Sequence, residues 1–216
     1  MHNDIYGHGR SLERALLRLQ ERPDVCSENK ARIASFMDVL STRNLSLSRR
    51  LKYANNLTRV AILLGKPFDK ATKEDLATMF VHVAKAGYAP NTIRDFKVLL
   101  KVFYQWLENS PRKHYPERVA WLDAGGTAEC KHYDRNELLT RGDYAALQAA
   151  ADNTRDKLLT ALLFHTGGRI GEVLALRVRD FRQEQGGTIW GVRIDGTKTK
   201  ASKREVPIKD EETVKL

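Results

Sequence analysis

The segment from residue 164 to residue 176 combines glycines with an arginine and a glutamate at a spacing that suits phosphate chemistry. It reads Phe-His-Thr-Gly-Gly-Arg-Ile-Gly-Glu-Val-Leu-Ala-Leu, and an apolar helix precedes it. Gly167 and Gly168 let the chain leave that helix in a left-handed turn and begin a short second helix, Ile170 to Leu176. Arg169 then lies at the partly positive N-terminal end of the second helix, beside free backbone N–H groups. An arginine in that place is well suited to bind a phosphate.

Two other interpretations of this segment compete with phosphate binding. A glycine-rich nucleotide loop is excluded, because such loops follow a strand and end in Gly-Lys-Ser or Gly-Lys-Thr. A structural salt bridge between Arg169 and Glu172 remains open, because an acidic residue in the first turn relieves the conflict between the arginine and the helix dipole. His165 lies on an apolar helix, where we expect a packed or capping histidine.

A turn rich in Gly, Thr and Lys follows this segment. Alternating apolar residues predict strands over Thr188–Ile194 and Arg204–Ile208, paired as a hairpin or a small sheet. The turn between them begins at Asp195-Gly196 and carries Lys198 and Lys200.

Residues 1–110 are predicted to form a small helical bundle, because apolar residues recur there at helical spacing in five runs. The third run ends at Gly65 and Pro67. The fourth is expected to begin at Thr72, with Asp75 completing a capping box. The fifth opens at Pro90.

The third and fifth helices each carry basic and polar side chains on the face opposite the apolar stripe. These residues are Arg49, Lys52, Asn56 and Arg59 on the third helix, and Arg94, Lys97, Lys101 and Tyr104 on the fifth. Such faces can hold DNA phosphates while the amides contact base edges. Most charged helix faces are simply solvated. The presence of two such faces in the segment with most of the excess positive charge nevertheless favours a nucleic-acid-binding function.

The composition and the charge distribution limit the class of protein. Of the 216 residues 42% are hydrophobic and 30% charged, which excludes wholesale disorder. The net charge is +10, with +7 in residues 1–110, zero in residues 111–140 and +3 in residues 141–216. That excess favours an anionic partner.

Helix breakers divide the chain. Pro111, Pro116 and Gly125-Gly126 predict a linker with a short helix around Arg118–Leu122. The expected domains are residues 1–110, a linker over 111–134 and residues 135–216.

Several other classes are not expected. Two isolated cysteines, Cys26 and Cys130, provide neither a disulfide framework nor a cysteine-rich zinc site. No long apolar run and no leader is recognised, so neither membrane spanning nor secretion is expected.

Three motifs in this sequence resemble those of the tyrosine recombinases, the family of phage-type integrases and chromosome-dimer-resolving recombinases. Thr166–Leu176, followed by Arg179-Asp180-Phe181, is similar to their first catalytic-arginine box. Gly196–Ile208 is similar to their catalytic-lysine turn, and Gly87–Ile93 with Phe103–Leu107 to the end of their core-binding domain. The resemblance implies a mainly α chain: an N-terminal SAM-like helical bundle, then an incomplete α+β catalytic domain with a small β-sheet or hairpin.

The resemblance also implies a mechanism without metal or nucleotide. In this family a tyrosine attacks the scissile phosphate, giving a 3′-phosphotyrosine and a free 5′-hydroxyl. Arg169 would neutralise the phosphate in the transition state, with Glu172 supporting it. Lys198 would protonate the departing 5′-oxygen as general acid, and Lys200 is the second candidate and a DNA contact. We expect Lys203 and Arg204 to face the DNA backbone or solvent.

The sequence departs from the family pattern after the hairpin. The family's His-x-x-Arg box and its tyrosine nucleophile would follow much later, and all seven tyrosines here precede Arg169. We therefore expect the front two-thirds of a mobile-element recombinase, inactive alone. The alternative is a DNA-binding protein that occupies recombination sites without catalysis, whereas the ordered motifs disfavour a generic RNA or ribosomal protein. The expected partners are double-stranded DNA and further copies of the chain assembled on it, in the nucleoid of the cytoplasm.

Overall fold

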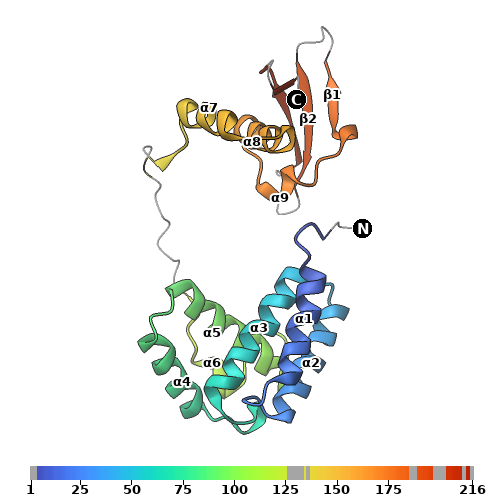
Figure 1. Ribbon diagram of the computed structural model, residues 1–216. Helices are drawn as coiled ribbons and strands as arrows, with labels where there is room; N and C mark the ends of the chain where they lie inside the picture. The colour runs from blue at the N-terminus through green and yellow to red at the C-terminus, as the bar shows by residue number, and fades with distance from the viewer. Residues whose placement is uncertain are drawn as a thin grey trace. The chain divides into compact units, whose positions relative to one another are not determined.

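The chain folds into two compact units, one spanning Tyr6–Cys130 and the other formed by Lys131–Leu216 (Figure 1). The computed structural model describes residues 4–125, 134, 137–184, 189–196, 203–210 and 213–214. Within these residues no helix is both long and apolar enough to cross a membrane.

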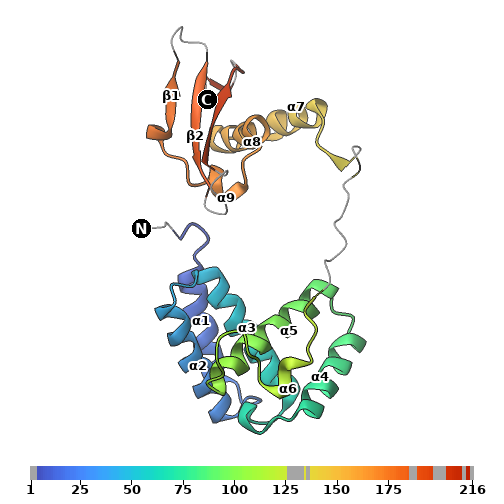
Figure 2. The same ribbon diagram turned by 180° about the vertical axis from the view of Figure 1, so that it is seen from behind.

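The first unit is helical, as its apolar periodicity predicts. Its helices, which Figure 2 shows from behind, are α1 (His8–Glu21), α2 (Ser27–Thr42), α3 (Leu47–Leu64), α4 (Lys73–Lys85), α5 (Pro90–Leu107) and α6 (Glu117–Ala120), with a 3-10 turn η1 (Phe68–Lys70). Helix α4 begins at the predicted capping box, in which Thr72 and Asp75 bond each other's backbone N–H. Gly65 ends α3 at φ 61°, a left-handed conformation that glycine adopts without strain.

Aromatic rings fill the core between these helices. Phe36, Phe68 and Phe103 are completely buried. The Phe103 ring meets the other two edge-on, with centroid distances of 5.3 Å to Phe36 and 4.8 Å to Phe68. This geometry adds to the stabilisation that burial of the rings provides. The core fixes α5 against α2 and the η1 turn.

Tyr104 belongs to this core, so the prediction that it shares the polar face of α5 is wrong. Its side chain is fully buried, and its hydroxyl donates to the Phe68 carbonyl over 3.1 Å. Burial raises the pKa of Tyr104, so the phenol stays neutral. Helical spacing places residue 104 at the edge of the apolar stripe. The aromatic ring there is buried with the other apolar side chains of the core.

The residues that directly follow α5 pack against the first unit, although we expected them to belong to a linker. Val119 on α6 and Leu122 after it are buried in the same core. Arg118 holds this segment in place, because its Nη1 donates to the carbonyls of Asp69 and Ala71 at 3.1 and 2.7 Å. The prolines at 111 and 116 shape a loop and a short helix that belong to the bundle. Residues 126–133 of the expected linker lie outside the described residues.

The second unit sets helices against a small sheet. Its elements are α7 (Arg141–Ala150), α8 (Thr154–Thr166), α9 (Ile170–Val173), a 3-10 turn η3 (Val178–Asp180), β1 (Phe181–Gln183), β2 (Trp190–Asp195) and β3 (Lys203–Ile208). The strands form an antiparallel sheet in the order β1-β2-β3. The pair β2–β3 is the predicted hairpin, whereas β1 was not predicted, because three residues are too few to show an alternating pattern.

The core of the second unit lies between α8, α9 and the sheet. Leu162, Val173, Val192, Ile194 and Ile208 are buried there. Helix α8 contributes less than its apolar sequence predicts, because its remaining large side chains are only partly buried. Helix α9 ends at Val173, three residues earlier than expected. The fold is thus mostly helical, with one small three-stranded antiparallel sheet in its second half.

Candidate functional site

The turn between α8 and α9 places Arg169 as predicted. Gly167 ends α8 at φ 58°, in the left-handed region. The next glycine is required by crowding, because a Cβ on Gly168 would lie 2.9 Å from Val173 Cγ2 and 3.0 Å from Thr166 Oγ1. The Thr166 hydroxyl closes the turn by accepting the Gly168 N–H at 3.1 Å. Arg169 follows as the N-cap residue of α9.

Glu172 holds Arg169 at two points. One carboxylate oxygen accepts from Arg169 Nη1 at 2.7 Å, and the other accepts the Arg169 backbone N–H at 3.1 Å. The two side chains differ greatly in exposure: 56% for Arg169 and 10% for Glu172. Among the described residues, Glu172 is the one hydrogen-bond partner of the Arg169 side chain. The salt bridge left open by the sequence is therefore present, and it leaves most of the guanidinium facing solvent.

The environment of Glu172 keeps its carboxylate charged. Its pKa is lowered, first by the backbone N–H of Arg169 and then by the two arginine side chains that bond it. A carboxylate held in this way can orient a cation over a wide pH range. The site therefore combines a fixed anion with an exposed guanidinium, which is suited to a phosphate oxygen.

Arg204 on β3 is the second arginine on Glu172, an internal partner that we did not expect. Its Nη2 lies 3.4 Å from Glu172 Oε2, and its side chain is 30% exposed. The signal was present in the sequence, because Arg204, Val206 and Ile208 alternate on one face of the strand. Val206 and Ile208 both pack into the core of the second unit, so this face points inward.

The two candidate general acids cannot be placed, since Lys198 and Lys200 both lie outside the described residues. The strands on either side of them are described and pair in register, with Asp195 opposite Lys203. Lys203 itself is exposed, as expected.

His165 packs within the second unit. Its ring meets Tyr144 and Phe164 edge-on, with centroids 5.5 and 5.4 Å away. Its Nε2 lies 3.7 Å from Asp210 Oδ2. These contacts agree with the packed histidine predicted from the sequence. In the part of the chain that the structure describes, no three His, Cys, Asp or Glu side chains are placed to hold a metal ion.

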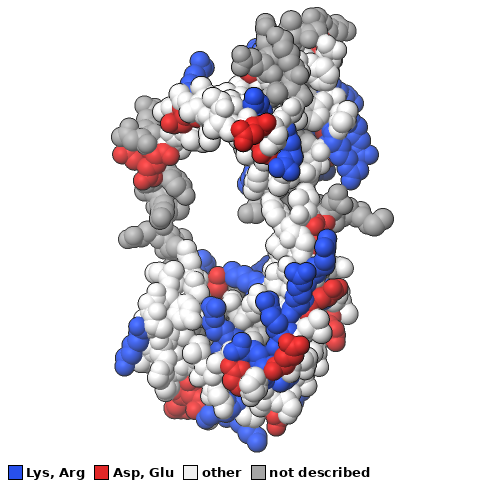
Figure 3. All heavy atoms as spheres, viewed as in Figure 1, with Lys and Arg blue, Asp and Glu red and all other residues white. Residues whose placement is uncertain are grey.

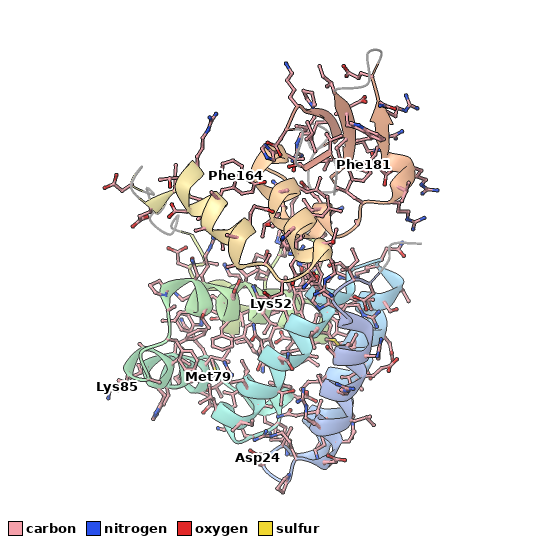
Figure 4. All side chains as sticks on the ribbon, turned by 45° about the horizontal axis from the view of Figure 1, so that its top comes forward. Asp24, Lys52, Met79, Lys85, Phe164 and Phe181 are labelled. Carbon is pink, nitrogen blue, oxygen red and sulfur yellow. The ribbon has the colours of Figure 1, made fainter. Side chains whose placement is uncertain are left out.

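The basic faces of α3 and α5 adjoin in the first unit. Lys52 on α3 forms an ion pair with Asp95 on α5, with Nζ and Oδ2 2.6 Å apart, and Figure 4 labels Lys52 on its helix. Arg59 lies over the Tyr88 ring, 5.6 Å from its centroid, just before α5 begins. These two contacts join the α3 set to α5 and to the residues just before it. We use the name α3–α5 surface for the predicted residues taken together: Arg49, Lys52, Asn56, Arg59, Arg94, Lys97 and Lys101.

Several cations of the α3–α5 surface are partly engaged within the protein. Arg94 Nε donates to the Ala124 carbonyl at 3.0 Å, and Lys101 Nζ lies 4.9 Å from the Tyr115 ring centroid. Arg49, Lys52, Arg59 and Arg94 are nevertheless all exposed. Figure 3 shows basic and acidic atoms interspersed over the side of the first unit on which α1 and α3 lie. Sequence reasoning missed Asp95, because a lone acid next to Arg94 gives no hint that it reaches across to α3.

Comparison with known proteins agrees with this architecture. No protein-family model matches the chain. The sequence is 28% identical over 168 residues to tyrosine recombinase XerD of Agrobacterium fabrum. The matched region covers 71% of this chain and 50% of the relative. The chain thus spans half the length of the curated relative it matches. The sequence match and the fold support a tyrosine recombinase family assignment, at modest identity.

A solved structure shares the fold. The XerH site-specific recombinase, bound to its difH substrate in a pre-cleavage complex, matches with a TM-score of 0.57 and 19% identity. The match covers 88% of this chain and 55% of XerH. The mainly helical chain with its small antiparallel sheet therefore has the tyrosine recombinase fold.

Proposed function

We propose that residues 1–216 form the DNA-binding part and the first catalytic part of a site-specific tyrosine recombinase. The observation that carries the proposal is the exposed Arg169 guanidinium, fixed at the start of α9 by a mostly buried glutamate. The sequence similarity to XerD supports the same function. In this proposal Tyr6–Cys130 is the core-binding domain, and Lys131–Leu216 is the first portion of the catalytic domain.

In this function Arg169 bonds the non-bridging oxygens of the scissile phosphate. Its planar guanidinium offers parallel N–H donors, and it stabilises the negative charge that grows in the transition state. Glu172 restricts the rotation of Arg169, so that less conformational freedom is lost when the phosphate binds. Lys198 protonates the 5′-oxygen as it leaves, with Lys200 as the second candidate. The chemistry that these residues perform requires no metal and no cofactor.

The DNA partner is a duplex that lies on the α3–α5 surface. Lysine and arginine there neutralise backbone phosphates, and Asn56 contacts a base edge. Copies of the protein assemble on the recombination site, because strand exchange joins two DNA duplexes. The protein acts at the nucleoid.

We propose further that residues 1–216 do not cleave DNA by themselves. All seven tyrosines precede Arg169 in the chain, and covalent catalysis requires a nucleophile. The same observation favours a second candidate function for residues 1–216, in which they occupy recombination sites without cutting them.

Two measurements on residues 1–216 test these proposals. Affinity for a duplex, measured by fluorescence anisotropy, should fall about tenfold or more when Arg169 is replaced by Met, because a charge-assisted phosphate contact is lost. Equal affinity of the variant and the wild type would contradict the role of Arg169. Denaturing gels of the protein with nicked duplexes of randomised sequence should show no covalent adduct. An adduct mapped to any of the seven tyrosines would refute the second proposal.

A further inference from the structure

Arg204 occupies a strand position at which the pattern of the sheet calls for an apolar residue. It lies opposite Ile194 on β2, and the next pairs on the same face are Val192 with Val206 and Trp190 with Ile208. Ile194, Val192 and Ile208 are buried. Because side chains alternate along a strand, Arg204 projects from the inner face at the end of the core, while Lys203 and Glu205 point outward.

From that position the Arg204 side chain reaches the first turn of α9. Its Nη2 is 3.4 Å from Glu172 Oε2, the oxygen that also accepts the Arg169 backbone N–H. The other carboxylate oxygen, Oε1, bonds Arg169 Nη1. Glu172 is thus shared between two arginines from different elements, and it is the most buried of the three.

The two arginines differ in what they can reach. Arg169 is 56% exposed and Arg204 30%, so Arg169 presents the larger accessible surface to a ligand. Arg204 fixes the carboxylate from the strand side. Without Arg204, both carboxylate oxygens would be held by Arg169 alone, and the two side chains could move together, because the terminal torsion of a glutamate is broad. The Arg204 guanidinium adds a third donor that ties this pair to β3.

We propose that Arg204 is a positioning residue, which holds Glu172 so that Arg169 is presented to the phosphate in one orientation. The inference rests on the proposed function, since it names how that site is organised. It links the β2–β3 hairpin to the start of α9, so the strand after the lysine turn and the arginine site are mechanically coupled. Arg204 acts through Glu172 and need not touch DNA.

The first test needs no DNA, and it compares Arg204→Met with Lys203→Met. Both variants remove one cation from β3, but only Arg204 bonds Glu172. The pKa of Glu172, measured by carbon-13 NMR of its carboxyl carbon, should rise in Arg204→Met and stay unchanged in Lys203→Met. Arg204→Lys should give an intermediate value, because the charge is kept and the planar donor pair is lost. An unchanged Glu172 pKa in folded Arg204→Met would overturn the proposal.

Folding is checked separately from positioning. Amide NMR spectra establish that each variant is folded, and Arg204→Lys and Arg204→Gln provide the comparison if Arg204→Met is not. A larger rise of the Glu172 pKa in Arg204→Gln than in Arg204→Lys supports the same role. No rise in any folded variant of residue 204 contradicts it.

The second test uses a double-mutant cycle on duplex affinity. Arg204→Met should weaken binding about threefold to tenfold with Glu172 present, as expected for partial loss of a charge-assisted contact. It should have no further effect in the Glu172→Gln background, because the residue through which it acts is already neutral. Equal losses in both backgrounds would identify Arg204 as a direct DNA contact and overturn the positioning role. If Arg169→Met binds like the wild type, the proposed function fails at this site, whereas the Glu172 pKa still reports on Arg204.

Discussion

Removing three cations from the α3–α5 surface should reduce the salt dependence of DNA binding. The triple variant Arg49→Gln, Lys52→Gln and Arg59→Gln tests the residues that α3 contributes. Each phosphate neutralised by a cation adds about 0.9 to the slope of log K against log salt concentration. If all three contact phosphates, the slope falls by about 2.7, so the affinity gained between 200 and 50 mM salt shrinks about 40-fold.

The contacts in the structure set a lower bound for the same variant. Lys52 is paired with Asp95, and Arg59 lies over Tyr88, so both are partly engaged before DNA arrives. If Arg49 alone contacts a phosphate, the slope falls by about 0.9 and the affinity gain shrinks about 3.5-fold. A measured slope change between these two values shows how many of the three residues contact phosphates, and therefore whether Lys52 and Arg59 leave their internal partners on binding DNA.

Fluorescence anisotropy over a salt series measures the slope. A matched control removes three exposed lysines from η1 and α4, in the variant Lys70→Gln, Lys73→Gln and Lys85→Gln, so that the net charge falls equally. We expect the control to retain nearly the wild-type slope. Equal slopes for the wild type and the α3 variant, or equal loss in the two variants, would refute the assignment of the DNA surface to α3.

Three further predictions concern single substitutions. Asp95→Asn releases Lys52 and removes an acid from the DNA surface, so duplex affinity should rise and the salt slope should steepen by about 0.9; a weaker complex would count against this surface. Gly168→Ala places a Cβ 2.9 Å from Val173 Cγ2, and thermal unfolding should show a loss of about 1–3 kcal/mol, whereas an unchanged melting temperature would show that the turn can yield. Glu172 has a lowered pKa in the folded protein, so its contribution to stability is fully present above its unfolded pKa of about 4.3 and is lost as the pH falls through the lower folded value. The stability difference between the wild type and Glu172→Gln, from denaturant unfolding at pH 6 and pH 3, should therefore shrink at the lower pH, and a constant difference would contradict the coupling.

Much of the helical architecture could be predicted, because local signals in the sequence coincide with the structure. The capping box at Thr72 and the left-handed glycine at 167 define helix ends through bonds and torsions within a few residues. The placement of Arg169 and Glu172 followed from the same local geometry. Such features depend on neighbours in the chain, which the sequence displays directly.

The features that sequence reasoning missed depend on partners distant in the chain. Arg204 bonds Glu172, 32 residues away, and Lys52 pairs with Asp95 on another helix. Tyr104 was assigned to the wrong face, because its hydroxyl finds a buried acceptor that only the packed structure provides. The alternating pattern of β3 could have placed Arg204 on the inner face, but not against a particular carboxylate.

NMR of the arginine side chains can detect whether Arg169 contacts a DNA phosphate. Residues 1–216, labelled with nitrogen-15, are titrated with a duplex selected for binding from a random library, and the Nε–Hε signals of Arg169 and Arg182 are followed. Arg182 is an exposed arginine on β1, which the proposal leaves free of DNA. We expect the Arg169 signal to shift and saturate with the duplex, while the Arg182 signal stays in place. Saturated binding with an unmoved Arg169 signal would show that Arg169 does not contact the DNA.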